Sequence, residues 1–391
     1  MQTLNLDSTI FMFAGEQSGD IHGSKLIDAI HKDYPQLKIV GVGGPRMRKG
    51  GLSPILKMED FQVMGFTDVL WSFPKLWKQF HKVRDYVLKI NPTHVILIDY
   101  PGLNLRLAKA LRKKGYQGKI IQYISPSVWA WGKGRIAHMA STLDLLLTIY
   151  PFEPACFAHT PLPVAYVGHP LAETIANYSY REDWCRNLGI HDKSRLIALF
   201  PGSRQGEIER NLPIQLEAAK LLCKEMPILQ FAISTAQPEY RELINSIIRN
   251  VPDADQLNAV FVPGQFNYEL MRDCRTAIAK SGTITLELAL HACPTVVIYR
   301  LTTLNRFIAQ YLLRLKLPFY CIVNILKGAS VFPELITRGC IPSDVCKETL
   351  SLHSDGKARQ ECIRACKEIQ TLLNTSNSSQ KASNLIFENH S

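Results

Sequence analysis

Short runs of β-branched and aromatic residues alternate with longer amphipathic stretches over the first half of the chain. The short runs predict strands at Ile10–Ala14, Lys38–Val42, His94–Ile98, Lys119–Ile124, Leu145–Tyr150 and Val164–Val167. Between them, apolar residues at helical spacing predict helices that include Ile21–Asp33, Leu76–Lys89 and Asn104–Lys114. This alternation is typical of βαβ units, in which helices connect parallel strands.

The same rhythm restarts near Arg195. Strands are predicted at Leu196–Phe200, Leu229–Ser234, Ala259–Val262, Thr276–Ala279 and Thr295–Tyr299, with helices that include Leu212–Glu225, Glu239–Asn250 and Thr285–His291. We therefore expect the α/β class, with two parallel sheets that face each other across a cleft. Ligands of such sheets bind outside the carboxyl ends of the strands, so the loops after each strand are the ones to search.

The predicted domain boundaries follow from this pattern. Residues 1–176 form the first domain, the polar stretch 177–193 is a linker, and residues 194–341 form the second domain. Residues 342–373 are predicted to be helical, and whether they pack back on the first domain is left open. The Ser/Asn-rich residues 374–391 are predicted to be a disordered tail.

The net charge of the chain limits the class of partner that we expect, but it does not decide among the candidates. The chain of 391 residues has 45 Lys and Arg against 34 Asp and Glu, a formal net charge of +11. This excess favours an anionic partner, which could be nucleic acid, an anionic lipid surface or a phosphorylated small molecule. Ten scattered cysteines without a CxxC pair indicate neither a disulfide framework nor a zinc site. No signal peptide or membrane span is recognisable, so we expect a cytosolic, non-integral protein.

Two loops of the first domain carry candidate chemistry. The segment from Gly15 to Asp20, which includes Glu16 and Ser18, follows the first strand and precedes a helix. Glycines there expose backbone N–H groups to an anion or a polar ligand, although Ser18 or Asp20 could simply cap the helix. Asp99 ends a nearly apolar strand, where it could serve as a general base or cap the following turn.

Two loops of the second domain have the character of a phosphate and nucleotide site. Gly202, Ser203 and Arg204 follow a strand, and the arginine fork matches phosphate oxygens. In the second loop, Ser281, Gly282 and Thr283 begin a helix, and Glu287 lies one turn further on the same face. A carboxylate in this place can hold two ribose hydroxyls, whereas a capping box would account only for the Ser and Thr.

Aromatic residues raise a third question. Ser127, Trp129 and their neighbours could line a binding wall or could plug the edge of the core. Another group is interleaved with lysines in a pattern that suits an anionic membrane surface: Met64, Phe66, Val69, Leu70, Trp71, Phe73 and Trp77. Base stacking and ordinary core packing are the alternatives for this second group.

Taken together, these motifs resemble the lipid-A-disaccharide synthase family of bacterial glycosyltransferases. The resemblance covers about residues 8–370 and rests on Ala14–Glu16 with Ser18–Asp20, Gly41–Met47, Val63–Gly65, Ile98–Asp99 with Pro101 and Asn104, Ser125–Trp131, Gly168–Pro170, Pro201–Arg204 with Glu207, and Ser281–Thr283 with Leu286–Glu287. The segment Ser125–Trp131 is its most specific part. Where the family usually has Leu-Pro-Asn-Leu around Asn324, this chain has Ile322-Val323-Asn324-Ile325, without the proline.

The resemblance implies a GT-B fold with two Rossmann-like domains and an inverting, metal-independent transferase without a cofactor. It would join UDP-2,3-diacylglucosamine to 2,3-diacylglucosamine 1-phosphate, forming the β-1,6-linked disaccharide 1-phosphate and UDP. Asp99 and Arg204 would be catalytic. Donor UDP would be bound by Gly202, Ser203, Arg204, Gly264, Ser281, Gly282, Thr283, Glu287 and Asn324. The acceptor would be bound by Gly15, Glu16, Ser18, Asp20, Asn104, Ser127 and Trp129.

The family also implies peripheral attachment to the anionic cytoplasmic face of the inner membrane, no nucleic-acid partner, and a homodimer as one allowed state. Two alternatives remain from the residues alone. One is another GT-B enzyme, such as a sugar-nucleotide 2-epimerase, which needs no acceptor. The other is a non-catalytic basic nucleic-acid-binding protein, whose binding would fall steeply with salt.

Overall fold

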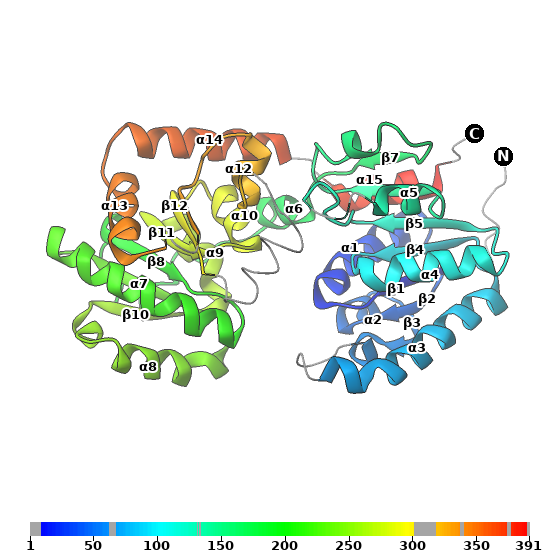
Figure 1. Cartoon of the computed structure of the whole chain (residues 1–391), viewed down its shortest axis with the longest axis horizontal. Helices are drawn as coiled ribbons and strands as arrows, with labels where there is room; N and C mark the ends of the chain where they lie inside the picture. Colours follow the sequence, from blue (N-terminus) through cyan, green and yellow to red (C-terminus); the bar gives the residue numbers. More distant parts are fainter. Residues whose placement is uncertain are drawn as a thin grey trace. The chain divides into compact units, whose positions relative to one another are not determined.

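The computed structural model describes residues 9–61, 68–130, 132, 134–300, 318–336, 340–373 and 377–388. The chain divides into two units (Figure 1). The first unit comprises Met1–Glu173 together with Leu373–Ser391, and the second comprises Thr174–Leu372. Each is an α/β unit with a parallel sheet, which confirms the predicted fold class.

Within the described residues, the first unit has a seven-stranded sheet in the order β3-β2-β1-β4-β5-β6-β7. Its strands are β1 (Thr9–Ala14), β2 (Lys38–Gly43), β3 (Ser53–Lys57), β4 (His94–Ile98), β5 (Lys119–Tyr123), β6 (Leu145–Thr148) and β7 (Val164–Tyr166). Its helices are α1 (Gln17–Asp33), α2 (Pro45–Lys49), α3 (Asp68–Ile90), α4 (Pro101–Lys113) and α5 (Arg135–Ala140), while α6 (Pro170–Ala176) crosses the boundary between the units.

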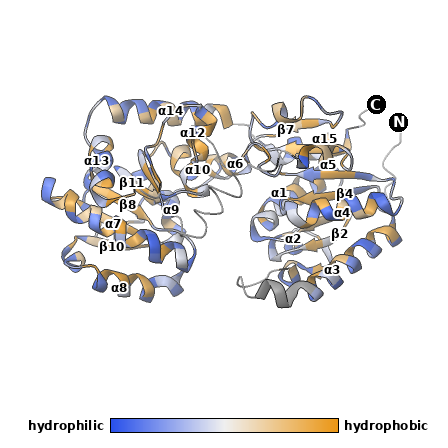
Figure 2. Cartoon of the chain, viewed as in Figure 1, coloured by the Kyte–Doolittle hydropathy of each residue, from blue (hydrophilic) through white to orange (hydrophobic). Residues whose placement is uncertain are grey.

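Both faces of this sheet are buried, which explains why its strands read as nearly continuous apolar runs (Figure 2). Successive side chains of β1 alternate between the faces, so Phe11 and Phe13 join one core while Ile10 and Met12 join the other. The first core is covered by α3 and α4, and the second by α1 and α15 (Ser378–Phe387).

The second unit repeats this architecture. Its described residues form a six-stranded sheet in the order β10-β9-β8-β11-β12-β13. The strands are β8 (Leu196–Phe200), β9 (Gln230–Thr235), β10 (Ala259–Pro263), β11 (Thr276–Lys280), β12 (Thr295–Tyr299) and β13 (Glu334–Ile336). The helices are α7 (Gln205–Glu225), α8 (Arg241–Asn250), α9 (Asn267–Asp273), α10 (Thr283–Leu290), α12 (Ile322–Lys327), α13 (Pro342–His353) and α14 (Lys357–Leu373).

The predicted strands are confirmed to within two residues at their ends, but two edge strands went unpredicted. β3 contains Pro54, which removes a ladder hydrogen-bond donor, and β13 has only three residues. The stretch 177–193 was predicted to be a linker, yet it belongs to the second unit. Trp184 is buried in that unit's core, and its indole N–H donates to Asp273 Oδ2 at 2.8 Å.

The prediction of a disordered tail is wrong for residues 377–388, most of which form α15. Ala382 and Ile386 pack into the core beside α1, and the Ser378 hydroxyl donates to the Glu173 carboxylate. Four-residue spacing of these apolar side chains supplies a buried face that the Ser/Asn composition conceals. It is α15 that returns to the first unit, whereas α13 packs on α7 in the second.

Among the helices that the structure describes, none combines the length and the apolar character that crossing a membrane requires.

Candidate functional site

Each sheet has one point at which its strand order reverses. In the first unit this switch point lies between β1 and β4, and in the second it lies between β8 and β11. The connections that leave adjacent strands there run in opposite directions, and open α/β sheets bind ligands at this place. The four loops singled out in the sequence follow these four strands, so the fold brings them together in two pairs.

At the first switch point, the two predicted loops are joined directly. The Ser18 hydroxyl, in the first turn of α1, donates a hydrogen bond to Asp99 Oδ2 at 2.7 Å. Asp99 is half-buried and adopts a left-handed backbone, with φ of 50°. Tyr100 follows at φ of 43°, so two consecutive non-glycine residues occupy this costly region. Strain of this kind is concentrated at functional sites.

Buried amides hold this turn in place. Asn104 Nδ2 donates to the carbonyl oxygens of Asp99 at 2.6 Å and of Ile98 at 3.2 Å. Gln122 Nε2 donates to the same Asp99 carbonyl at 3.0 Å. Both side chains are wholly buried, so Asn104, predicted to bind the acceptor, instead fixes the backbone that carries Asp99. Gln122 was not singled out in the sequence.

Half-buried His22 interacts electrostatically with Asp99, and buried His169 interacts with His22. Burial lowers the pKa of His22 to about 4, against an opposing attraction from Asp99. Burial, together with His22, lowers the pKa of His169 to about 3. Both rings are therefore neutral at neutral pH. His22 Nδ1 has no hydrogen-bond partner within the described part of the chain.

The other residues of the first loop have distinct places. Gly15 is buried, and a Cβ there would lie 2.6 Å from the Tyr100 ring, so only glycine allows this contact. Glu16 is exposed at the start of α1. Asp20 is buried, and its carboxylate accepts the backbone N–H groups of Arg46 at 3.0 Å and Met47 at 2.9 Å. The structure thus gives Asp20 the task of anchoring α2.

The Ser127–Trp129 loop follows β5, where Ile124 has φ of 72°, an outlier for a β-branched residue. Ser127 is exposed, while Trp129 is half-buried and packs edge-on against Phe152 with ring centroids 5.5 Å apart. Close by, burial raises the pKa of Glu153 to about 7, although the N–H groups of Tyr150 and Ile149 partly offset it.

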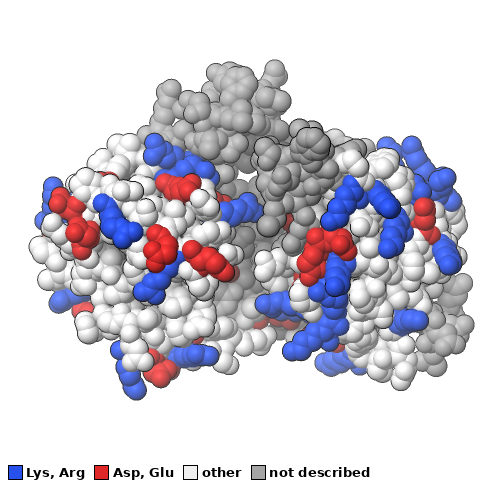
Figure 3. Space-filling view, turned by 90° about the horizontal axis from the view of Figure 1, so that it is seen from below, with Lys and Arg blue, Asp and Glu red and all other residues white. Residues whose placement is uncertain are grey.

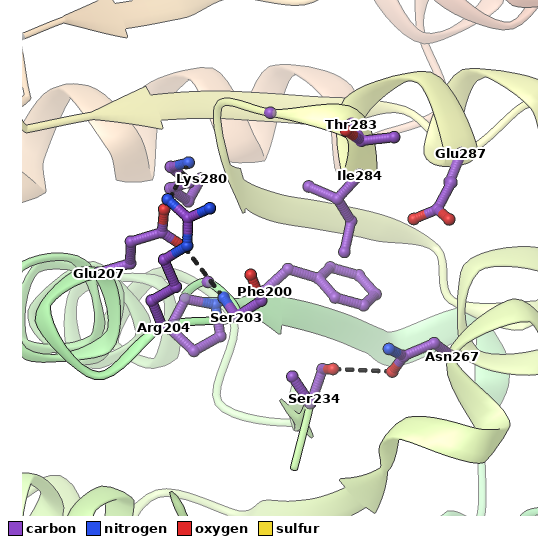
Figure 4. Close-up of a pocket in the computed structure, with 14 residues that line it drawn as sticks. Phe200, Ser203, Arg204, Glu207, Ser234, Asn267, Lys280, Thr283, Ile284 and Glu287 are labelled. Atoms are coloured by element: carbon purple, nitrogen blue, oxygen red, sulfur yellow. Dashed lines mark hydrogen bonds and ion pairs between the residues drawn. The ribbon is translucent and has the colours of Figure 1, made fainter. Parts of the chain in front are cut away.

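The second switch point contains a pocket of about 390 Å³, formed entirely by the second unit (Figure 4). Its lining includes six of the nine residues predicted to bind UDP: Gly202, Ser203, Arg204, Gly282, Thr283 and Glu287. Gly202 has φ of 134°, and a Cβ there would lie 2.6 Å from Glu207 Cβ. The tight loop after β8 therefore requires glycine at this position. Ser281, the remaining residue of the second loop, immediately precedes Gly282 and donates its N–H to the Ile298 carbonyl.

An ion pair closes one end of the pocket. Lys280 Nζ lies 2.9 Å from Glu207 Oε1, and the other oxygen of Glu207 accepts the Ser203 N–H at 3.1 Å. Although burial acts to raise it, the pKa of Glu207 is lowered by the Lys280 ammonium and the Ser203 N–H. Arg204 is exposed beside this pair (Figure 4). Cations and backbone donors thus converge where a phosphate would bind.

The opposite end of the pocket holds Glu287 (Figure 4). Burial raises its pKa, and the Tyr268 hydroxyl, which donates to Oε1 at 3.4 Å, partly offsets this effect. Glu287 lies on α10 one turn beyond Thr283, as predicted. The pocket therefore has a cationic end and a hydroxyl-accepting end.

Besides Ser281, two predicted donor-site residues do not line this pocket. Asn324 is fully buried: Nδ2 donates to Phe332 O and Glu334 Oε1, and Oδ1 accepts the N–H groups of Val331 and Phe332. Its hydrogen bonds therefore hold the segment between α12 and β13. Gly264 follows β10, where a Cβ would meet the Ala236 carbonyl at 2.9 Å.

The pocket also contains residues that the sequence did not single out: Phe200, Ser234, Asn267 and Lys280. Ser234 is the last residue but one of β9, and its hydroxyl donates to Asn267 Oδ1 at 2.7 Å. A polar residue at the end of an apolar strand is the available signal, the same one that identified Asp99. It becomes informative only once the order of the strands is known.

The predicted membrane-facing group is only partly visible. Met64 and Phe66 lie outside the described residues, and for Val69, Leu70, Trp71 and Phe73 the structure describes the backbone of α3 alone. Trp77 is 54% exposed on α3, where it packs against Phe80 and His81. On the face drawn in Figure 3, basic and acidic side chains are intermixed on both units.

Within the described ranges, no group of three or more His, Cys, Asp or Glu side chains is arranged to hold a metal ion. The pocket nevertheless offers fixed positive charge and hydrogen-bond donors at one end and a carboxylate at the other. This arrangement suits a ligand that carries phosphate and vicinal hydroxyl groups.

Solved structures share this fold at low sequence identity. A putative UDP-N-acetylglucosamine 2-epimerase from Listeria monocytogenes aligns with a TM-score of 0.64 at 11% identity, covering 95% of this chain and 94% of that one. A UDP-GlcNAc 2-epimerase from Neisseria meningitidis, bound to UDP-GlcNAc, aligns with a TM-score of 0.61 at 13% identity, covering 97% and 99%. With the two parallel sheets, these likenesses establish the GT-B class of two Rossmann-like units.

Sequence comparison is more specific. The family described as lipid-A-disaccharide synthetase matches residues 10–387. The lipid-A-disaccharide synthase of Chlamydia pneumoniae is 41% identical over 94% of this chain and 61% of the relative. That of Trichlorobacter lovleyi is 36% identical over 89% of this chain and 88% of the relative. The chain thus spans about three fifths of the chlamydial relative and most of the second one. It belongs to the lipid-A-disaccharide synthetase family.

Proposed function

We propose that this chain is a glycosyltransferase that joins UDP-2,3-diacylglucosamine to 2,3-diacylglucosamine 1-phosphate. The products are the β-1,6-linked disaccharide 1-phosphate and UDP. The observation that carries the proposal is the pocket at the second switch point, with Arg204 and the start of α10 at one end and Glu287 at the other. Membership of the family supports this choice of the two substrates.

In the donor site, the ribose and the diphosphate of the nucleotide would be bound at opposite ends of the pocket. Glu287 accepts hydrogen bonds from the ribose hydroxyls, while the exposed Arg204 and the N–H groups at the start of α10 bind the diphosphate. As the bond to the sugar breaks, negative charge grows on the departing UDP. Donors that are already in position stabilise that charge without reorganisation, which is the usual source of the largest catalytic effect.

Asp99 would act as the general base. Its carboxylate takes the proton from the 6-hydroxyl of the acceptor while that oxygen attacks the anomeric carbon of the donor sugar. UDP leaves from the opposite face, so the anomeric configuration inverts. The Ser18 hydroxyl donates a hydrogen bond to Oδ2 of Asp99. Such a carboxylate has Oδ1 and its remaining lone pairs available to accept a proton.

We further propose that the enzyme works on the cytoplasmic face of the inner membrane, to which α3 attaches it peripherally. The support is the 54% exposure of Trp77, next to the exposed Lys75 and Lys78. An amphipathic aromatic ring flanked by lysines is suited to an anionic lipid surface. Acyl chains on both proposed substrates make such attachment useful.

The decisive assay measures UDP release from the diacylated UDP-sugar, with and without the monosaccharide lipid acceptor. Release that depends on the acceptor, together with formation of a disaccharide, is the expected result. An epimerase would convert the UDP-sugar without any acceptor, so that product would contradict the proposal. Sedimentation with anionic vesicles tests the membrane attachment separately.

A further inference from the structure

Lys280 occupies an unusual place for a lysine. It is the last residue of β11, after the buried residues Thr276–Ala279, and its side chain is only 19% exposed. The ammonium lies at the cationic end of the pocket, 2.9 Å from Glu207 Oε1 (Figure 4). A Cβ at Gly282 would lie 3.5 Å from Lys280 Nζ, so the charge also stands beside the first turn of α10.

The surroundings of this ammonium fix its orientation. Glu207 is itself fixed by the Ser203 N–H, so the carboxylate ties the loop after β8 to the end of β11. The Tyr299 ring lies on another side, with its centroid 5.6 Å from Nζ. An ammonium has three N–H donors. One of them satisfies Glu207, which leaves donors for a ligand in the pocket.

We propose that Lys280 binds the diphosphate of the nucleotide, as a second cation alongside Arg204. This inference rests on the proposed function, because it assigns a residue to the proposed donor site. A lone Glu207 carboxylate on the pocket wall would repel a diphosphate. Lys280 cancels that charge, and its spare donors then bind a phosphate oxygen, while Arg204 gives this end of the pocket a net positive charge.

A simpler role for Lys280 is to neutralise Glu207 and nothing more. The two roles predict different behaviour when both partners are removed. If Lys280 only neutralises Glu207, the double variant Lys280→Met with Glu207→Gln has the same UDP affinity as Glu207→Gln alone. If Lys280 binds phosphate, the double variant binds UDP more weakly than Glu207→Gln does. The double variant also leaves no unpaired charge, so it is the safer one to fold.

Calorimetry of UDP binding to the full chain provides the test, with uridine followed by ligand-observed NMR. We expect Lys280→Met, alone or on the Glu207→Gln background, to raise the Kd for UDP roughly tenfold or more. The Kd for uridine, which has no phosphate, should stay the same. The matched control is Lys220→Met on α7, because the Lys220–Glu217 pair is 3.1 Å long and its lysine is similarly shielded at 21% exposure.

The results separate this inference from the proposal beneath it. Equal UDP affinity in Glu207→Gln and in the double variant overturns the inference alone. A loss of uridine affinity as large as the loss of UDP affinity overturns it too, because a structural defect would explain both. Failure of the wild-type chain to bind UDP at all overturns the proposed donor site and, with it, the role of Lys280.

Discussion

The switch point between β1 and β4 and the one between β8 and β11 have the same topology but opposite chemistry. At the first, the Asp99 carboxylate has the neutral Ser18 hydroxyl as its side-chain hydrogen-bond donor. At the second, Glu207 is paired with Lys280 next to Arg204. A carboxylate paired with a cation is held in its charged form as part of the framework. One with a neutral donor can still accept a proton, which is why we assign the base to the first unit.

The strongest test of this difference between the two switch points is the substitution of Asp99 by Asn. Asn keeps the shape, tolerates the left-handed backbone and still accepts the Ser18 hydrogen bond, but it cannot take up the proton. We expect kcat to fall by about 10²–10⁴, or about 3–5 kcal/mol in barrier, while UDP affinity stays unchanged. Asp85→Asn on the exposed surface of α3 is the control. A kcat within a few-fold of the wild type would remove Asp99 from this role.

Glu153 in the first unit and Glu207 in the second show how the environment of a carboxylate shifts its pKa in opposite directions. Glu153 in the first unit accepts the backbone N–H groups of Ile149 and Tyr150, and burial raises its pKa from 4.5 to about 7. The folded state therefore holds a proton that the unfolded state loses above pH 4.5. Stability from this group is present at low pH and is lost as pH rises toward 7. Glu207, whose pKa is lowered, has the opposite sign.

Replacing Glu153 by Gln should therefore stabilise the chain increasingly between pH 4.5 and 7. The gain should reach about 3 kcal/mol near neutral pH, since each pKa unit corresponds to about 1.4 kcal/mol. Melting temperatures of the wild type and variant across pH 5–8 provide the measurement. Glu209→Gln, on the exposed surface of α7, controls for the loss of one carboxylate. Parallel curves for Glu153→Gln and the wild type would show that Glu153 is not buried as a neutral acid.

In each unit, the loops of the candidate site could be predicted from the sequence, because residues that follow parallel strands lie at one edge of the sheet. Asp99 in the first unit, and Arg204 and Glu287 in the second, were singled out from such loops. Lys280, Ser234 and Asn267 were not, because their convergence depends on which strands are neighbours. The sequence does not predict the left-handed backbone at Asp99 and Ile124, because neither residue is glycine. Asn324 was predicted from the family motif to bind the donor, but its side-chain oxygen accepts the backbone N–H groups of Val331 and Phe332.

The cationic end of the second switch point can be weakened without touching the Glu207–Lys280 pair. Arg204→Ala should raise the Kd for UDP by about 10–100-fold, since a charge-assisted hydrogen bond to phosphate contributes about 1.5–3 kcal/mol. The chemical step should slow as well, because charge on the departing UDP loses a donor. Arg249→Ala, at an exposed position on α8, is the control. Unchanged UDP affinity by calorimetry would exclude Arg204 from the phosphate site.

The smallest expected effect concerns Ser18, whose hydroxyl donates a hydrogen bond to Asp99, the proposed base. Ser18→Ala removes one neutral hydrogen bond, worth about 1 kcal/mol, so kcat should fall by roughly three- to tenfold with UDP affinity unchanged. Ser18→Thr keeps the hydroxyl and should restore most of the loss. Ser24→Ala is the matched control, because the Ser24 hydroxyl on the same helix bonds the Ile21 carbonyl. If Ser18→Ala and Ser24→Ala have equal effects on kcat, the hydrogen bond to Asp99 has no special role in catalysis. A fall confined to Ser18→Ala, and rescued by Thr, would show that the first switch point depends on the orientation of one carboxylate.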